Sequence, residues 1–312
     1  MRSFALLLLF ASSCFFAPSA GFAQPSGGPY GPIERVYEIP KAPHVYYVAP
    51  DGKTDAPGTT LDQPTTIEAA IARVVTGDVI VLRGGVYRAG GLELNQGITL
   101  QPYAGERPIL KGTRVADQWQ PLRSNLWRTQ WKTLFPARPL GWWQRAREGM
   151  RTPVHRFNND MVFVDGRMLK SAGWEGEVGP DSYFIDYDSG HVYIGVDPKG
   201  HEVEITAFDF ALIRRARPVH GKESDRKGPT IRGITFTQYA FRALEIEGKT
   251  GAASPSEEPT NEPVGLSDPA TYGKEVTGTT LENVTVTFCS RVAGYFRGDR
   301  LTIRNSLFSD TS

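Results

Sequence analysis

The chain has 312 residues, 40% of them hydrophobic, and its 35 Lys and Arg nearly balance 34 Asp and Glu, for a net charge of +1. Phosphate binding needs a basic face, and none stands out here, so the composition argues against a nucleic-acid partner. Beyond the first 23 residues no apolar run approaches the roughly 18 residues of a membrane-spanning helix, so we expect no membrane span.

The N-terminus has the three parts of a secretory signal peptide. A basic residue precedes the apolar run Phe4–Phe10, and small residues end at Ala23. We therefore predict that residues 1–23 are removed and that the mature protein is secreted or periplasmic. The alternative is a lipoprotein anchored through Cys14, but the residue three positions earlier is Ala11 and two Phe follow, which disfavours a lipobox.

Residues 24–45 are rich in Pro and Gly and are predicted to form an extended leader. A short amphipathic helix comes next, because Thr65 and Glu68 have capping-box spacing and Gly77 supplies a stop. Its apolar positions fall at i, i+3, i+4 and i+7: Ile67, Ala70, Ile71 and Val74. Such a helix has one narrow apolar face, and this face needs something to cover.

Short strands follow the helix. Val79–Leu82 is a continuous apolar run bounded by glycines, which indicates a strand buried on both faces and closed by Gly84–Tyr87. Ile98–Gln101 and Ile109–Lys111 read as two more strands. Their spacing fits consecutive sides of the first coils of a wound chain.

Residues 113–228 differ in residue pattern from the segments on either side. Met161–Leu169 and Tyr183–Gly195 each read as a hairpin that turns at Asp-Gly or Asp-Ser-Gly. The alternating segment Glu202–Thr206 returns the chain to the strands that follow. We therefore predict an inserted antiparallel β subdomain.

A repeat is visible further downstream. Segments that begin at Thr230, Thr280 and Thr302 align, and the last two start 22 residues apart. That step suits one coil of a β-solenoid, in which each strand pairs with its neighbours above and below. The earlier step is 50 residues, and we attribute its excess to a Pro-, Ser-, Gly- and Glu-rich loop at 249–276.

Two residue types within these repeats carry expectations. Asn283 and Asn305 occupy equivalent places, where stacked Asn side chains can bond along a turn, although Gly233 interrupts the ladder. After signal removal Cys289 is the lone cysteine, so no internal disulfide can form. We expect it to be a small buried residue rather than a reactive thiol.

The segment 46–112 resembles the N-terminal cap of secreted right-handed parallel β-helix proteins of the pectate-lyase-like superfamily. The matching stretches are Tyr47–Gly52, Pro57–Thr59, Gln63-Pro64, Ile67–Ala72 and Gly77–Tyr87. The resemblance implies an all-β chain with a capping helix and first coils at 46–112, the insertion at 113–228 and further coils at 229–312. Because the chain stops at Ser312 within the third repeat, we expect the C-terminal coils to be missing.

This cap does not identify a reaction, since it precedes lyases, hydrolases and epimerases alike. Insertions like the predicted one are familiar in extracellular β-helix proteins, including glycoside hydrolases that act on xylan fragments, and that likeness is one of architecture. In lyases of the superfamily a basic residue removes a proton beside a uronate while Ca²⁺ or a second cation neutralises the acid. The hydrolases use a carboxylate pair instead.

All six Trp lie between Trp119 and Trp174. Indoles stack on the apolar faces of sugars, but a small β subdomain also needs large side chains for its core, and core packing is the favoured reading. The pair Trp142 and Trp143, beside Arg145, is our candidate for substrate binding. This cationic, aromatic cluster would suit an acidic sugar.

Arg297 and Asp310 are the candidate catalytic residues, because they lie furthest toward the middle of the inferred full solenoid. The metal requirement stays open. Asp51, Asp55 and Asp62 surround a Gly-rich turn and could bind Ca²⁺ through carboxylate oxygens. Turn formation is the favoured reading, because the three show no regular ligand spacing.

We therefore predict an exported, monomeric, carbohydrate-active enzyme that degrades extracellular polysaccharide as a lyase or glycosidase. Its insertion would form one wall of the substrate cleft. The alternatives are a non-catalytic glycan-binding or surface-adhesion protein, and an inactive truncated fragment. A carboxylate pair on the solenoid face would favour the enzyme, whereas a face of stacked Asn, Thr and aliphatic residues alone would favour the binder.

Overall fold

The computed structural model describes residues 31–311, except 124, 138–152 and 248–274. The predicted signal peptide with Cys14, the start of the leader and nearly all of the predicted loop at 249–276 therefore lie outside the described residues. Residues 31–312 belong to one compact unit.

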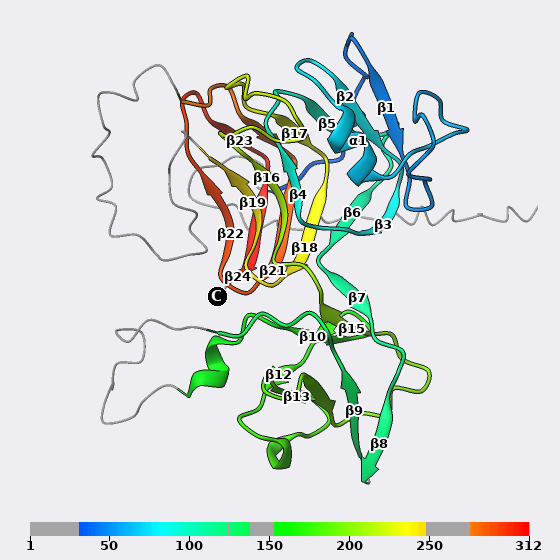
Figure 1. Ribbon diagram of the computed structural model, residues 1–312, viewed down its shortest axis with the longest axis vertical. Coiled ribbons are helices and arrows are strands. Elements are labelled where there is room, and N and C mark those ends of the chain that lie inside the picture. The colour runs from blue at the N-terminus through cyan, green and yellow to red at the C-terminus, as the bar shows by residue number, and fades with distance from the viewer. Residues whose placement is uncertain (1–30, 124, 138–152, 248–274, 312) are drawn as a thin grey trace, which may run out of the picture. The chain divides into compact units, whose positions relative to one another are not determined.

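Three parallel sheets, here called A, B and C, contain most of the strands (Figure 1). Sheet A contains β1 (Val45–Val48), β2 (Val79–Leu82), β5 (Thr99–Pro102), β17 (Thr230–Arg232), β20 (Thr280–Glu282) and β23 (Thr302–Arg304). Sheet B contains β3 (Gly85–Arg88), β6 (Pro108–Lys111), β18 (Thr235–Tyr239), β21 (Thr285–Cys289) and β24 (Leu307–Thr311). Sheet C contains β4 (Leu92–Leu94), β16 (Phe210–Arg214), β19 (Arg242–Ile246) and β22 (Val292–Phe296).

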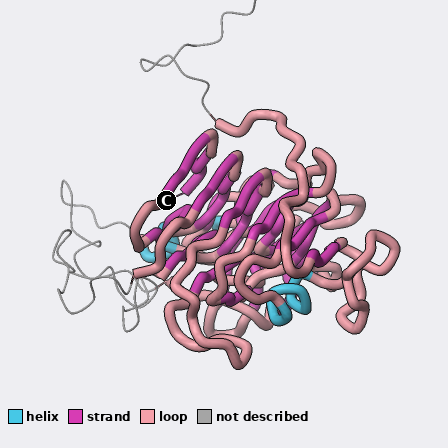
Figure 2. Tube along the Cα trace, turned by 90° about the horizontal axis from the view of Figure 1, so that it is seen from above, coloured by secondary structure: helices cyan, strands magenta, loops and turns pink. Residues whose placement is uncertain are grey.

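The chain visits sheets A, B and C in turn, and each strand pairs in parallel with the corresponding strand of the next circuit, here called a winding (Figure 2). The predicted alignment of the repeats is confirmed, because Thr230 pairs with Thr280 and Thr280 with Thr302. The prediction that Gly84–Tyr87 only closes the preceding strand is wrong. Gly85–Arg88 is a separate strand of sheet B, and β4 follows it in sheet C.

The core between the three sheets consists mainly of aliphatic side chains stacked in register, with Tyr87, Phe236 and Tyr239 among them. Leu100, Ile231 and Leu281 occupy paired positions in sheet A, and all three are buried. Cys289 belongs to the same cluster as a free thiol, and burial raises its pKa to about 12. The prediction that it is a small buried residue is therefore confirmed.

The predicted helix is present as α1 (Ile67–Arg73), and its buried face belongs to the same core cluster. Two details of the prediction are wrong. The N-cap is Thr66, whose hydroxyl accepts the Ala69 N–H at 3.2 Å. The helix ends at Arg73 rather than near Gly77, because the Asp78 carboxylate accepts the Val75 N–H at 2.8 Å and holds the chain in a turn.

The described part of the leader lies along the turn between sheets A and B. There Gly233, Asn283 and Asn305 of successive windings all have positive φ, 67°, 53° and 48°. The Asn283 side chain does not continue a ladder of asparagines. It donates to the Tyr37 hydroxyl and accepts the Ile33 N–H at 3.2 Å, so it fastens the leader to the windings.

Two further sheets, D and E, are built from the segment between β6 and β16. Sheet D contains β7 (Thr113–Val115), β10 (Val162–Val164), β11 (Arg167–Met168) and β15 (Val203–Thr206). Sheet E contains β8 (Gln120–Arg123), β9 (Leu126–Gln130), β12 (Lys170–Ser171), β13 (Ser182–Asp186) and β14 (His191–Ile194). Short 3₁₀ turns lie at Val154–Phe157 and Glu175–Glu177.

Both predicted hairpins are confirmed, as β10–β11 and β13–β14. The Asp165-Gly166 turn has positive φ at both residues, which the twist of a two-residue hairpin requires. The segment is not purely antiparallel, because β12 pairs in parallel with β13. Apolar side chains from sheets D and E, among them Val162, Ile205 and Val192, form a second core cluster.

A buried ion network joins sheet D to sheet B. The Glu204 side chain on β15 is fully buried and accepts hydrogen bonds from Lys111 at 2.8 and 2.9 Å, from Thr113 at 3.1 Å and from Arg88. Burial alone would raise the pKa of Glu204, but the hydrogen bonds from Lys111 and Arg88 outweigh it and lower that pKa. The carboxylate is therefore ionised and is the point where the two sheets meet.

We predict that Glu204→Gln lowers the free energy of unfolding by about 3 kcal/mol, because it removes the buried counter-charge of Lys111 and leaves Arg88 with only the exposed Glu202. Glu202→Gln is the matched control. Glu202 is 52% exposed and lies 3.4 Å from Arg88, so we expect a loss of less than about 1 kcal/mol. Urea unfolding of both variants near neutral pH measures the difference, and equal losses would contradict the assigned role of Glu204.

Candidate functional site

The corner between sheets B and C brings three dissimilar residues into one column. The Phe241 N–H donates to the Asp209 carbonyl at 2.9 Å, and the Arg291 N–H donates to the Phe241 carbonyl at 3.2 Å. Asp209, Phe241 and Arg291 thus occupy the same corner position in successive windings. Neighbouring strands are spaced about 4.8 Å apart, so the backbone positions that carry the carboxyl group, the aromatic ring and the guanidinium group lie next to one another along the column.

Aromatic contacts link this corner column to the inserted sheets. The Arg291 guanidinium lies 4.9 Å from the centroid of the Phe241 ring, and Phe241 meets Phe135 edge to face at 6.0 Å. Arg291 Nε also donates to the Asn159 side chain at 2.9 Å. Phe135 and Asn159 precede and follow residues 138–152 in the sequence, and both lie next to the corner column.

The electrostatics of the corner column differ from those of exposed charges. Asp209 is half-buried, and this burial raises the pKa of its carboxyl group, while Arg242 and Arg215 act in the opposite direction. Burial lowers the pKa of Arg291. Perturbed titratable groups that cluster in one place are typical of functional sites, because catalysis needs groups poised between two protonation states.

A second column lies beside the corner on sheet B. Gln238, Phe288 and Asp310 interrupt their strands with positive φ of 66°, 51° and 52°, which is costly for side-chain-bearing residues. The preceding winding has Gly112 at this position, where a Cβ atom would lie 2.4 Å from the Gln238 carbonyl oxygen. Bulges of this kind re-aim side chains, and here Phe288 meets Phe163 of sheet D at 5.6 Å.

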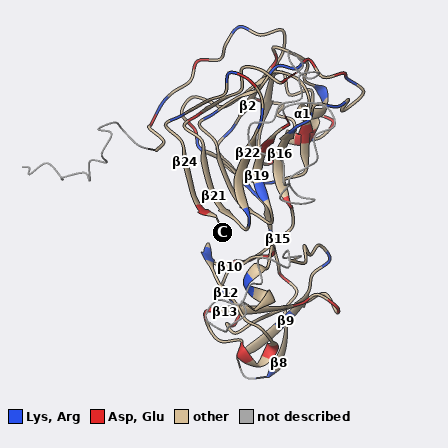
Figure 3. Ribbon diagram, turned by 90° about the vertical axis from the view of Figure 1, so that its left-hand side faces the viewer, with Lys and Arg blue, Asp and Glu red and all other residues tan. Residues whose placement is uncertain are grey.

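Sheet C and the residues that directly follow its strands carry charges of both signs (Figure 3). Arg215 lies between Glu93 at 2.5 Å and Glu247 at 2.6 Å, and Arg242 pairs with Glu245 at 2.5 Å. The Glu245 side chain is only 1% exposed, and burial raises the pKa of its carboxyl group. Its exposure and its ion pair favour a structural role over direct contact with a ligand.

The two predicted catalytic residues lie on different sheets. Arg297 directly follows β22 of sheet C, where its guanidinium lies 4.8 Å from the Tyr295 ring and donates to the Tyr295 hydroxyl at 2.5 Å. Asp310 is exposed on β24, at the end of the bulge column of sheet B, and its carboxylate accepts the Ser309 hydroxyl at 2.9 Å. Of the two residues, only Asp310 belongs to a column that contacts sheet D, because Phe288 of that column meets Phe163.

The predicted substrate-binding residues Trp142, Trp143 and Arg145 lie outside the described residues. Among the other tryptophans, Trp119, Trp127 and Trp131 pack against the second core cluster, and Trp174 is 61% exposed. Within the described residues, no three His, Cys, Asp or Glu side chains lie close enough together to hold a metal ion. Asp51, Asp55 and Asp62 therefore do not form such a group.

The corner column was missed at the sequence level, although a signal for it exists. The repeats that begin at Thr230 and Thr280 are 50 residues apart, and the same offset carries Phe241 onto Arg291. Phe241 is aromatic and Arg291 is cationic, so an alignment based on similar side chains does not match these two positions.

No protein-family model and no curated protein matches the chain. Among solved structures, the complex of XylC with xylose is similar at 16% identity and a TM-score of 0.59, over 86% of this chain and 54% of that one. A glycoside hydrolase (15% identity, TM-score 0.39, 64% and 51% covered) and a rhamnogalacturonan lyase (12%, 0.25, 83% and 62%) are more distant.

Of these three, only the XylC structure is close enough to bear on the fold. The chain is therefore a mostly β protein of parallel sheets with the fold of XylC over the aligned part, and it spans about half of the XylC chain. In the described part of the chain, no helix has the length and apolar character needed to cross a membrane.

Asp160 anchors the chain beside the corner. Its buried carboxylate accepts the Phe135 N–H at 2.6 Å and the Thr206 hydroxyl at 2.8 Å, next to the Asn159 that binds Arg291. Burial raises the pKa of Asp160 to about 6, and these hydrogen bonds only partly offset the effect. The group therefore keeps its proton in the folded protein at pH values where the unfolded chain has lost it.

We predict that this proton makes stability fall as pH rises. Between the ordinary Asp pKa of 3.8 and about 6 the folded state binds more protons than the unfolded state, so the unfolding free energy declines by up to about 3 kcal/mol. Asp160→Asn lacks this contribution. Urea unfolding of both proteins between pH 4 and 7 should show the wild-type advantage shrinking with pH, and a difference independent of pH would contradict the assignment.

Proposed function

We propose that the chain is part of a carbohydrate-active enzyme, a glycoside hydrolase that acts on an oligosaccharide or polysaccharide. The observation that carries the proposal is the likeness to XylC, a protein held in complex with xylose, over 86% of this chain. The windings then form a right-handed parallel β-helix, with α1 covering its open end and sheets D and E inserted between two of its strands. The match covers only 54% of the XylC chain, so we assign the proposed activity to the whole protein and not to this chain alone.

The corner column is proposed as the floor of the substrate cleft, with sheets D and E as one wall. Phe241 offers an aromatic ring to the apolar face of a sugar, and Arg291 holds the wall through Asn159. Asp209 supplies a carboxyl group whose raised pKa suits a general acid that protonates the leaving oxygen. A hydrolase needs a second, ionised carboxylate within about 10 Å of the first. Exposed Asp310 on the adjoining sheet lies three windings from Asp209, about 14 Å at the usual strand spacing, so we propose it as a carboxylate that contacts the substrate further along the cleft and not as the partner of Asp209.

We also propose that the protein is exported, with residues 1–23 as the signal, and works as a monomer on carbohydrate outside the cytoplasm. The apolar run Phe4–Phe10 and the small residues before Gln24 support this.

A second candidate function is glycan binding without catalysis. On sheet B, Thr235 pairs with Thr285 and Thr237 pairs with Thr287, and the hydroxyl of Thr287 donates to that of Thr237 at 2.9 Å. Hydroxyl groups held in register can bond to the hydroxyl groups of a glycan without offering an acid or a base. This face supports the binder, whereas the corner column supports the enzyme.

We predict that Asp209→Asn lowers kcat for hydrolysis of xylo-oligosaccharides by at least about 100-fold and changes KM only a few-fold, because a general acid acts mainly in the transition state. Wild-type activity should fall as pH rises through the raised pKa of Asp209, and the variant should lose that limb. Asp188→Asn, at an exposed turn of sheet E, is the matched control.

Reducing ends and the absorbance of unsaturated products are followed together on the full-length protein. Reducing ends alone support the hydrolase, and unsaturated products would move the reaction to a lyase. Binding of the polymers without either product would replace the enzyme by the binder. Full activity of Asp209→Asn would remove Asp209 from the mechanism.

A further inference from the structure

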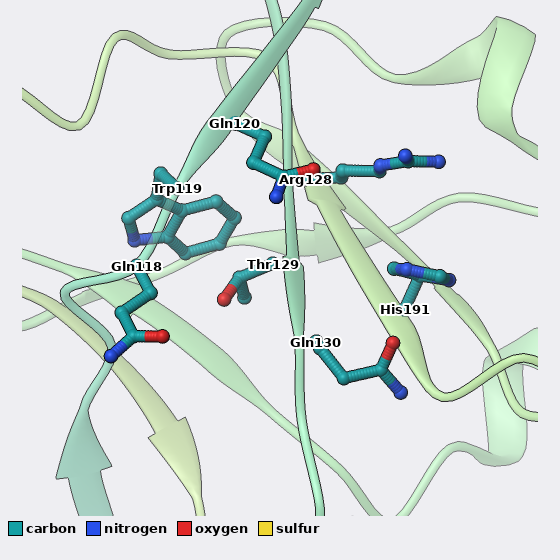
Figure 4. Close-up of a pocket in the computed structure, with 7 residues that line it drawn as sticks. All are labelled: Gln118, Trp119, Gln120, Arg128, Thr129, Gln130 and His191. Carbon is teal, nitrogen blue, oxygen red and sulfur yellow. The ribbon is translucent and has the colours of Figure 1, made fainter.

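A hollow of about 300 Å³ lies on sheet E, apart from the corner column. Its lining is polar except for one indole: Gln118, Trp119, Gln120, Arg128, Thr129, Gln130 and His191 (Figure 4). Three amide side chains in one hollow offer donors and acceptors together, which is the pattern that sugar hydroxyl groups need.

Strand pairing places four of the polar lining residues on one face of the sheet, while Thr129 lies on the other face. Gln120 pairs with Arg128 across β8 and β9, and Gln130 pairs with His191 across β9 and β14. Because side chains alternate along a strand, Arg128 and Gln130 extend from the same side of β9, as Figure 4 shows. The hollow is therefore built from three neighbouring strands of one sheet together with Gln118 and Trp119, which lie in the segment just before β8.

Arg128 is the residue that indicates a ligand. Its Nε atom is buried and has no hydrogen-bond partner in the described part of the chain. By contrast, Arg123 on the adjacent strand pairs with Glu175 at 3.2 Å. No carboxylate lines the hollow, so its guanidinium charge is not balanced there. The hollow thus holds a positive charge without a counter-charge, and an anionic group that enters the hollow would supply one.

Three other lining residues, Trp119, Gln130 and His191, are fixed in place before any ligand binds. Trp119 Nε1 donates to the Ala116 carbonyl at 2.8 Å, which holds the indole at the rim. Gln130 donates to the Ser189 carbonyl at 2.9 Å, and His191 Nδ1 lies 2.9 Å from the Ser189 hydroxyl. Side chains held in this way lose little freedom on binding.

We infer that this hollow is a binding site for a carboxylate-bearing sugar, a uronate carried by the glycan, separate from the site of bond cleavage. Arg128 receives the carboxylate in a two-pronged contact, the amides take the ring hydroxyls, and Trp119 covers an apolar edge. The inference rests on the proposed function for the class of ligand. It adds a second contact on the same glycan, which would hold an acid-substituted chain on the protein.

The test is calorimetric titration of the full-length protein with xylotriose that carries one glucuronic acid, and with the same compound after reduction of its carboxyl group. We expect the acid form to bind at least about tenfold more tightly. Arg128→Gln should remove that preference and Arg128→Lys should restore part of it, because lysine keeps the charge and loses the fork. Arg123→Gln, on the neighbouring strand and already ion-paired, should keep the wild-type preference.

Equal affinity for the two ligands, or an unchanged preference in Arg128→Gln, would overturn the inference. The titration is repeated with Asp209→Asn, which should keep the preference while losing turnover. A wild-type protein that prefers the acid form but never cleaves the neutral oligosaccharide would defeat the proposed hydrolase and leave the uronate site standing. Cleavage of the neutral oligosaccharide without any preference for the acid form would support the proposed hydrolase and overturn the uronate site.

Discussion

Parallel pairing in register is the constraint on which the other features of this protein depend. Thr230, Thr280 and Thr302 stack because each strand pairs in register with the corresponding strand of the preceding winding, whatever the length of the segments between strands. A slip of one residue would turn every buried aliphatic side chain outward, so the core itself holds the register. Once that register is set, residues with nothing else in common, such as Asp209 and Phe241, are forced into the same column.

The inserted sheets depend on a second, polar constraint. Glu204 lies buried between Lys111 and Arg88 of sheet B, and Arg291 reaches Asn159 on the other side of the corner. Charged groups that are buried and paired tolerate little displacement, because separation exposes an uncompensated charge in a medium of low dielectric. The wall of the proposed cleft is therefore held to its floor by groups whose loss is costly, which is what a preorganised binding site needs.

The sequence predicted the features that arise from local chemistry. The hairpins were found because an Asp-Gly turn specifies its own geometry, and the repeats because Thr280 and Thr302 begin similar strands. The end of α1 was missed because the side chain of Asp78, just beyond the helix, sets it by accepting the Val75 N–H, and the spacing of the apolar residues does not reveal this hydrogen bond. The strands of three or four residues that begin and end with glycine or polar residues carry too little periodicity to be recognised. The site was missed for a different reason, since Phe241 and Arg291 are related by position in the winding and not by residue type.

Cysteine cross-linking tests the register most directly. Adjacent in-register Cα atoms lie within the roughly 4.4–6.8 Å that a disulfide spans, whereas an offset of two residues places them beyond it. Thr237 and Thr287 are paired, with their hydroxyl oxygens 2.9 Å apart. The Sγ of buried Cys289 lies 3.9 Å from the Thr287 carbonyl oxygen, so Cys289 is replaced by Ala in both variants. The account predicts that Thr237→Cys with Thr287→Cys forms a disulfide under mild oxidation and that Thr237→Cys with Thr285→Cys does not. A disulfide in the offset pair, or none in the paired one, would contradict the stacked windings on which the site is built.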